Sequence, residues 1–158
     1  HEPVKLRERA LVGGTYRDHI IICGYGPVGE RLVKKFRERG LLYIVLEHDV
    51  KIVDKVIAEG EEAIYFANAA QKMVLSHFNV NHCNAIIVTI ENEIQRQLIC
   101  ENIASFNPNI NSIVKVNNSA EEEIFEQLGM KHIINSRDTI ADMLAEEALA
   151  CNLQGKVV

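Results

Sequence analysis

Three glycines near the start of the chain have the spacing of a phosphate-binding turn. Gly24, Gly26 and Gly29 form a G-x-G-x-x-G pattern that follows an apolar run at 19–23 and opens a helical pattern. In that context the first glycine permits a tight turn, the second lets the backbone approach a pyrophosphate, and the third lets the helix lie close to the strand. Backbone amides and the positive end of the helix then attract phosphate.

The other residues of this turn determine which amides are available. Pro27 has no N–H, so the predicted phosphate donors are the amides of Tyr25, Val28 and Gly29. The glycine pattern alone leaves open a second interpretation, in which the turn is purely structural.

An acidic residue follows the second apolar run at the distance expected for a ribose ligand. Glu47 lies 18 residues after Gly29, close to the ~20 residues typical of dinucleotide-binding proteins. A carboxylate there accepts hydrogen bonds from ribose hydroxyls and repels a 2′-phosphate, which favours NAD or an adenosine phosphate over NADP. His48 follows directly and is included in the predicted site. Asp49 is the rival acid, and its alternative role is the N-cap of a helix from Val50.

The elements that must position these residues alternate along the chain. Strands are predicted at 19–23, 41–46, 63–66, 85–90, 112–116 and 132–134. Helices are predicted at 27–39, 50–58, 71–78, 93–106, 120–128 and 138–150, the last with Asp138 or Thr139 as N-cap. This alternation indicates an α/β fold, a doubly wound parallel six-stranded Rossmann sheet with helices on both faces.

Apolar residues at helical spacing are expected to face this sheet. In the helix predicted at 93–106 they are Ile94, Leu98, Ile99 and Ile103. Part of the surface of this helix and of 120–128 is expected to serve a two-fold dimer.

Length and composition restrict the classes of protein. The chain has 158 residues, 47% hydrophobic and 25% charged, which is typical of a soluble globular domain and excludes disordered, collagen-like and disulfide-rich classes. Its formal net charge of -5 and pI of about 5.7 argue against a nucleic-acid partner. Residues 1–18 carry +1. They are predicted to be a linker or the tail of a preceding helix, or else a boundary remnant, and 19–158 the Rossmann-type domain.

The cysteines and the acidic run at 121–123 each allow more than one interpretation. Cys23, Cys83, Cys100 and Cys151 lack metal or C-x-x-C spacing and are predicted to be buried, reduced thiols, with a reactive redox cysteine as the alternative. His77 and His82 beside Cys83 do not have the spacing of a metal site, and no metal is predicted. The acids at 121–123 are interpreted as favouring a helix dipole rather than binding a cation.

The later blocks of the sequence specify a family. The chain resembles the regulator-of-potassium-conductance (RCK) N-terminal domain, also called the TrkA-N or KTN domain, over about residues 19–150. The resemblance rests on segments 20–30, 43–49, 62–69, 75–80, 84–89, 112–117 and 128–134. The first two are shared with many dinucleotide folds, so the order and spacing of the others point to this family.

The resemblance implies a regulatory function rather than an enzyme. Such domains lie on the cytosolic side of potassium channels, uptake systems and potassium/proton antiporters. They bind NAD(H), ATP, ADP or AMP, dimerise, often form rings, and transmit ligand-dependent rearrangements to the membrane pore.

The resemblance also assigns residue roles. By similarity, Gly24 to Gly29 hold phosphates and Glu47 holds ribose. Asn68 and Ala69 are expected near the adenine or its ribose, Thr89 beside the nucleotide, and Lys115 within reach of phosphate.

Two departures from the family pattern concern ligand preference. The family usually has Gly-Asp-Ala where this chain has Ala67-Asn68-Ala69, which removes a charged acceptor. The family often has Arg where this chain has Pro27, which removes a cationic phosphate partner. A full regulator would add a smaller C-terminal subdomain, so the resemblance implies a fragment of a larger protein. Residues 1–18 would then be the linker or tail of a preceding membrane-proximal segment. Two other functions remain open: the cofactor-binding half of an NAD-dependent dehydrogenase, and an assembly-only Rossmann scaffold.

Overall fold

The computed structural model describes residues 16–151, which form one parallel sheet with flanking helices. The strands are β1 (Ile20–Cys23), β2 (Tyr43–Glu47), β3 (Ile64–Phe66), β4 (Ala85–Val88), β5 (Ser112–Val116) and β6 (His132–Asn135). Their order in the sheet is β3-β2-β1-β4-β5-β6, and every neighbouring pair is parallel. The predicted doubly wound fold is confirmed, and its order reverses between β1 and β4, where open α/β sheets bind ligands.

The helices follow the predicted alternation closely. They are α2 (Pro27–Glu38), α3 (Val50–Ala58), α4 (Lys72–His77), α5 (Glu93–Ala104), α6 (Ser119–Leu128) and α7 (Ser136–Ala150), with a 3-10 turn η2 (Val80–His82). The last helix begins at Ser136 rather than Asp138, because the side chain of Asn135 accepts a hydrogen bond from the Asp138 amide and is the N-cap.

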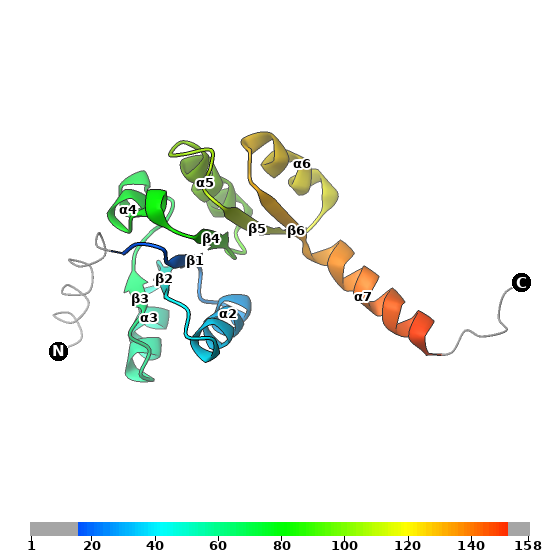
Figure 1. Ribbon diagram of the computed structural model, residues 1–158, viewed down its shortest axis with the longest axis horizontal. Helices are drawn as coiled ribbons and strands as arrows, with labels where there is room; N and C mark the ends of the chain where they lie inside the picture. The colour runs from blue at the N-terminus through cyan, green and yellow to red at the C-terminus, as the bar shows by residue number, and fades with distance from the viewer. Residues whose placement is uncertain (1–15, 152–158) are drawn as a thin grey trace, which may run out of the picture.

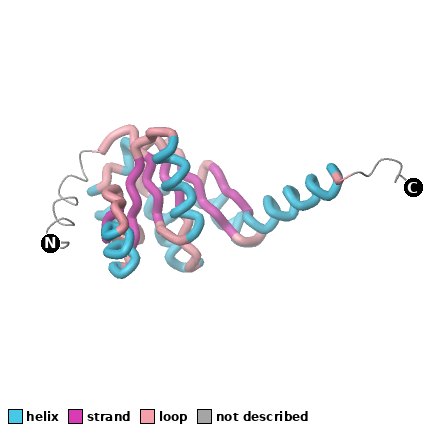
Figure 2. The backbone as a smooth tube through the Cα atoms, turned by 90° about the horizontal axis from the view of Figure 1, so that it is seen from below, coloured by secondary structure: helices cyan, strands magenta, loops and turns pink. Residues whose placement is uncertain are grey.

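Alternate side chains of each central strand enter two separate cores, beneath the helices that flank the sheet (Figures 1 and 2). Ile21 and Ile44 face the core shared with α4, α5 and α6. Ile22 and Val45 face the core shared with α2 and α3. Helices therefore lie on both faces of the sheet, as predicted.

The last helix does not return to the sheet. α7 extends away from the body of the domain (Figures 1 and 2) and contains no buried residue. Its large apolar side chains are Ile140, Met143, Leu144 and Leu149, all more than half exposed. Ile134 of β6 is also 47% exposed, so the expectation of a sheet buried on both faces is wrong at this edge.

The buried face of α5 is rotated from the prediction. Ile94 is 72% and Leu98 41% exposed. The residues that turn inward are Arg96, Ile99, Cys100 and Ile103, because these four lie at i, i+3, i+4 and i+7.

The thiols differ in burial although all four cysteines are free. Cys23 and Cys100 are buried as predicted, whereas Cys83 is only partly buried and Cys151 is exposed. Cys151 follows α7, which no other element within residues 16–151 covers, so the prediction of a buried thiol is wrong there.

The predicted N-terminal linker falls mainly on residues 1–15, which lie outside the described residues. Two of the described residues of that segment contact the domain: the Tyr16 hydroxyl is 2.5 Å from the Tyr65 hydroxyl, and the Asp18 amide donates to the His82 carbonyl at 2.9 Å. None of the helices within 16–151 combines the length and apolar character needed to span a bilayer.

Candidate functional site

The glycine turn has the geometry that its three positions predict. Gly24 has a φ of +107°, which favours glycine. A Cβ on Gly29 would lie 2.2 Å from the Gly24 carbonyl oxygen, so the first turn of α2 packs directly on the end of β1. A Cβ on Gly26 would meet nothing within 4 Å. The backbone at Gly26 is therefore open to a ligand.

The amides of this turn are only partly available. The Tyr25 amide donates to Glu47 Oε1 at 2.9 Å, so it already has a protein acceptor, and its predicted role as a phosphate donor stays a prediction. Val28 and Gly29 stand in the first turn of α2, where amides have no partner within the helix. These two amides and the helix dipole remain as the attraction for an anion.

Glu47 is held against the glycine turn by the end of β2. The residue is only 6% exposed, and its second oxygen, Oε2, accepts the Asp49 amide at 2.8 Å. Two backbone amides therefore fix both carboxylate oxygens, and each oxygen retains a lone pair for a further donor such as a ribose hydroxyl. The structure thus brings together the turn and the acid that the sequence predicts.

The residues after Glu47 have different roles. Asp49 Oδ1 accepts the Lys51 amide at 3.0 Å and is the N-cap of α3, which was its alternative interpretation. His48 is about half exposed, and its Nδ1 lies 3.4 Å from Glu47 Oε2. It stands between the carboxylate and the adjacent groove.

This groove runs past the carboxyl ends of β2 and β3. Its volume is about 640 Å³, and its lining residues are His48, Phe66, Ala67, Asn68, Gln71, Met73, Val74, His77 and Phe78. Asn68 Oδ1 accepts the Ala70 amide at 2.9 Å and shapes the turn after β3. Ala69 is buried and lines a much narrower crevice of about 10 Å³ between this turn and Ile90. Polar and apolar walls of this kind suit a purine ring.

Thr89 fastens the end of β4 to the glycine turn. Its hydroxyl lies 3.0 Å from the Cys23 carbonyl and 3.3 Å from the Gly24 carbonyl, to which it donates. Thr89 therefore borders the glycine turn, with its hydroxyl engaged by protein, and its predicted position beside the nucleotide stays a prediction.

Lys115 lies in a different cluster. Its Nζ is 2.9 Å from Glu91 Oε1 and 3.1 Å from Asn117 Oδ1. Within residues 16–151 the Lys115 ammonium forms no hydrogen bond with the glycine turn or with Glu47. A phosphate would have to compete with Glu91 for this ammonium group.

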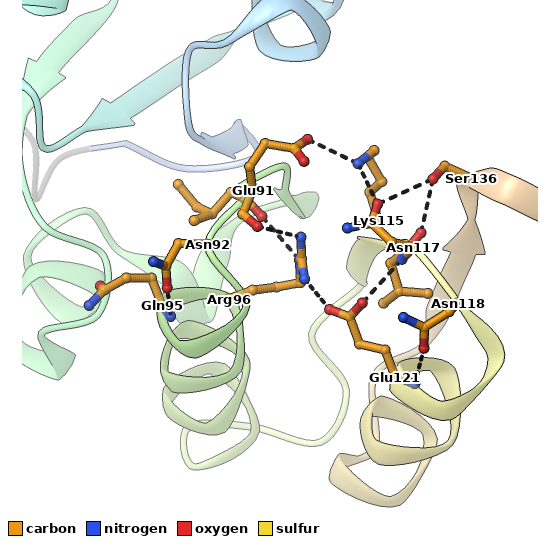
Figure 3. A network of polar contacts seen from close by, with 11 residues as sticks. Glu91, Asn92, Gln95, Arg96, Lys115, Asn117, Asn118, Glu121 and Ser136 are labelled. Atoms are coloured by element: carbon orange, nitrogen blue, oxygen red, sulfur yellow. Dashed lines mark hydrogen bonds and ion pairs between the residues drawn. The ribbon is translucent and has the colours of Figure 1, made fainter.

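The sequence did not predict one feature of the domain, a buried ion pair. Arg96 is fully buried and pairs with Glu121 of the acidic run (Figure 3). Glu121 is thus a buried partner in addition to an acid near a helix N-terminus. Arg96 lies at helical spacing from Ile99 and Ile103, and this spacing was the sequence signal that its side chain faces the core. No group of three or more metal-binding side chains occurs in the part of the chain that the structure describes.

The parallel sheet, the glycine turn after β1 and the acid at the end of β2 define a Rossmann-type domain. The family model of the TrkA-N domain matches residues 20–136. The chain therefore belongs to the TrkA-N domain family, and the resemblance found in the sequence is confirmed.

Similar sequences include potassium transport proteins. Potassium channel protein 1 of Methanocaldococcus jannaschii is 21% identical over 99 residues, which are 62% of this chain and 30% of that protein. A Trk system potassium uptake protein TrkA homolog of Methanothermobacter thermautotrophicus is 23% identical over 127 residues, 80% of this chain and 58% of the homolog. The chain thus spans less than two thirds of either relative.

Solved structures share the fold. The TrkA-N domain of the Escherichia coli inner membrane protein YbaL has a TM-score of 0.75 at 23% identity, covering 83% of this chain and 96% of that one. The GsuK channel bound to NAD has a TM-score of 0.68 at 20% identity, covering 75% and 21%. The Shewanella denitrificans Kef CTD in its AMP-bound form has 0.69 at 19% identity, covering 87% and 81%.

Proposed function

We propose that this domain binds an adenine nucleotide, NAD(H) or an adenosine phosphate, and thereby regulates a potassium channel or potassium transporter. The observation that carries the proposal is the Glu47 carboxylate, fixed by the Tyr25 amide beside the open backbone of Gly26. Ribose hydroxyls and a phosphate are the two ligand groups that such neighbouring sites accept. The GsuK and Kef structures, which share the fold, hold NAD and AMP.

Each predicted residue has a role in this proposal. The Gly24–Gly29 turn, with Tyr25, Pro27 and Val28, surrounds the phosphates, and Glu47 binds the ribose. His48, Asn68 and Ala69 border the base, and Thr89 fixes the turn. Lys115 contacts phosphate only after leaving Glu91.

The relatives favour regulation over catalysis and over a scaffold without ligand. They are potassium channel and potassium uptake proteins. By analogy with them, we place this domain at the cytoplasmic face of the membrane and assign it no catalytic role. A dehydrogenase half would require a substrate domain in the parent protein.

We also propose a homodimer and, beyond it, a ring. α7 exposes Met143 and Leu144, and α5 and α6 expose Ile94, Leu98 and Ile124. These two apolar surfaces lie on different elements. We assign the two-fold contact to α7, whose large apolar side chains are all more than half exposed, and the links between dimers to α5 and α6, where the sequence suggested the two-fold contact. A nucleotide would act by favouring one dimer arrangement over another.

Isothermal titration calorimetry with NAD, NADH, ATP, ADP and AMP tests the ligand. Binding of at least one nucleotide is expected, because the turn, the acid and the groove are adjacent. An absence of heat and of thermal stabilisation with all five contradicts the proposal and leaves the scaffold alternative.

Glu47→Gln tests the ribose contact. It is expected to weaken nucleotide binding about tenfold or more, since a charged acceptor of two ribose hydroxyls is lost. Asp49→Asn is the matched control, because it removes the same charge two residues away and keeps a good N-cap. Equal affinity of the two variants would show that Glu47 is not the ribose ligand.

A further inference from the structure

The buried pair of Arg96 and Glu121 joins two loops at the carboxyl edge of the sheet (Figure 3). Arg96 belongs to α5 and is 0% exposed, and Glu121 belongs to α6 and is 8% exposed. The rest of the guanidinium also has partners: Nε donates to the Ile90 carbonyl at 3.0 Å and Nη2 to the Glu91 carbonyl at 3.1 Å. A buried guanidinium with its donors engaged in this way fixes the positions of its three partners, the Ile90 and Glu91 carbonyls and the Glu121 carboxylate.

On one side the pair supports the wall of the glycine turn. Ile90, whose carbonyl binds Arg96, packs against Gly24: a Cβ there would lie 3.0 Å from Ile90 Cδ1 and 2.9 Å from Thr89 Oγ1. A movement of the turn on ligand binding would therefore press on the loop that Arg96 holds.

On the other side the pair reaches the first residue of α7. Glu121 Oε2 accepts the Asn117 amide at 3.1 Å. The Ser136 hydroxyl lies 3.4 Å from Asn117 Oδ1 and 3.1 Å from the Val116 carbonyl, to which it donates. A second link runs in parallel, since Asn135 Nδ2 donates to Glu122 Oε2 at 3.2 Å.

Helix α7 has little else to fix its direction. It contains no buried residue and extends away from the sheet (Figure 1). Its direction therefore depends on the contacts at its start, and these contacts end on Val116 and Asn117 before α6 and on Glu122 within α6.

We propose that Arg96 and Glu121 are positioning residues that couple the nucleotide turn to the direction of α7. The inference rests on the proposed function for the identity of the ligand. The contacts run from Gly24 through Ile90, Arg96, Glu121 and Asn117 to Ser136 in consecutive steps. Coupling of this kind requires that the glycine turn and the start of α7 both act on one shared structural element. The Arg96–Glu121 ion pair is that element.

The test without ligand is hydrogen–deuterium exchange of the whole chain measured by mass spectrometry. Arg96→Lys and Glu121→Gln are expected to speed amide exchange in the 89–92 loop and at 135–139 together, because both segments lose the same support. A single substitution can unfold the domain by leaving one buried charge without its partner. The double variant Arg96→Met with Glu121→Leu removes both charges together and so avoids this cause of unfolding. Faster exchange at only one of the two segments overturns the proposal.

A second ion pair provides the matched control. Arg37 of α2 pairs with Glu61, which also accepts the Tyr43 hydroxyl at 2.7 Å, at the opposite edge of the sheet. Arg37→Lys and Glu61→Gln are expected to leave exchange at both segments unchanged. If these controls speed exchange there as much, Arg96 and Glu121 have only a general structural role and the proposal fails.

The same variants with nucleotide separate this inference from the proposed function. AMP and NADH are expected to change exchange at 135–139 in the unmodified chain, and Glu121→Gln should abolish that change and weaken affinity by about fivefold. An unaltered response in Glu121→Gln overturns the coupling. If no nucleotide binds the unmodified chain, the proposed function fails, and the ligand-free exchange experiment still decides whether the pair links the two segments.

Discussion

Gly26 and Gly29 lie three residues apart in one turn, but their surroundings differ. A Cβ meets open space at Gly26 and the Gly24 carbonyl at 2.2 Å at Gly29. Gly26→Ala is therefore expected to change the free energy of unfolding by less than about 0.5 kcal/mol while obstructing the approach of phosphate and weakening nucleotide binding at least tenfold. Urea unfolding and calorimetry measure the two effects.

Gly29→Ala provides the contrast at the same scale. The added methyl group forces the helix away from β1, and a loss of about 1–3 kcal/mol in the free energy of unfolding is expected, as for overpacked cores. Equal stability of the two alanine variants would contradict this assignment of roles.

Thiol reactivity follows burial at the residue scale. Burial raises the pKa of the Cys83 thiol to about 11 and that of Cys100 to about 12, and it raises the pKa of Cys23 further. Cys151 is exposed. One fast-reacting thiol is expected with Ellman's reagent in the native chain, and Cys151→Ser should remove it. Fast reaction of two or more native thiols would disagree with the described burial.

At the scale of elements, His19 joins the start of β1 to the end of α4. The residue is fully buried, and its Nε2 lies 2.8 Å from the Phe78 carbonyl. Burial lowers the pKa of His19 below 6.5, although the contact with Phe78 and the charge of Asp18 act to raise it. The unfolded chain therefore binds the proton more tightly than the folded one.

The pH dependence of stability follows from this direction. The contribution of a neutral His19 is complete above pH 6.5 and decreases as pH falls toward its folded pKa, with a slope of at most about 1.4 kcal/mol per pH unit. Urea unfolding between pH 5 and pH 8 measures it. The variant His19→Gln does not titrate and is expected to lose this part of the slope. An identical slope in both proteins would show that His19 is not responsible.

At the scale of the whole molecule, α7 and the α5–α6 surface predict different assembly defects. Met143→Glu places a charge in the apolar face of α7 and is expected to convert a dimer to a monomer, because a buried unpaired charge is costly. Size-exclusion chromatography with light scattering measures the mass. Ile94→Glu is the comparison, expected to leave the dimer and abolish larger assemblies. A dimer that survives Met143→Glu would exclude α7 as the two-fold contact.

The sequence alone predicts the fold class, the order of elements and the core of the site. Apolar runs separated by amphipathic stretches predict a parallel sheet, because the central runs must be covered on both sides, and the edge strand β6 departs from this. Gly24, Gly26, Gly29 and Glu47 are also local signals, since each acts through its own backbone or the end of its own strand. Asn135 shows the limit of such signals: this competing cap, three residues before Asp138, moved the start of α7 to Ser136.

Only the tertiary structure decided how distant residues share their partners. The Tyr25 amide is occupied because β2 lies beside β1, which sequence spacing does not specify. Arg96 and Glu121 lie 25 residues apart and meet only because α5 and α6 pack on the same face of the sheet. The direction of α7 likewise depends on contacts at its first turn. The spacing of apolar residues along a helix or strand indicates which side of that element is buried. The pairing of polar groups depends instead on which elements become neighbours in the fold.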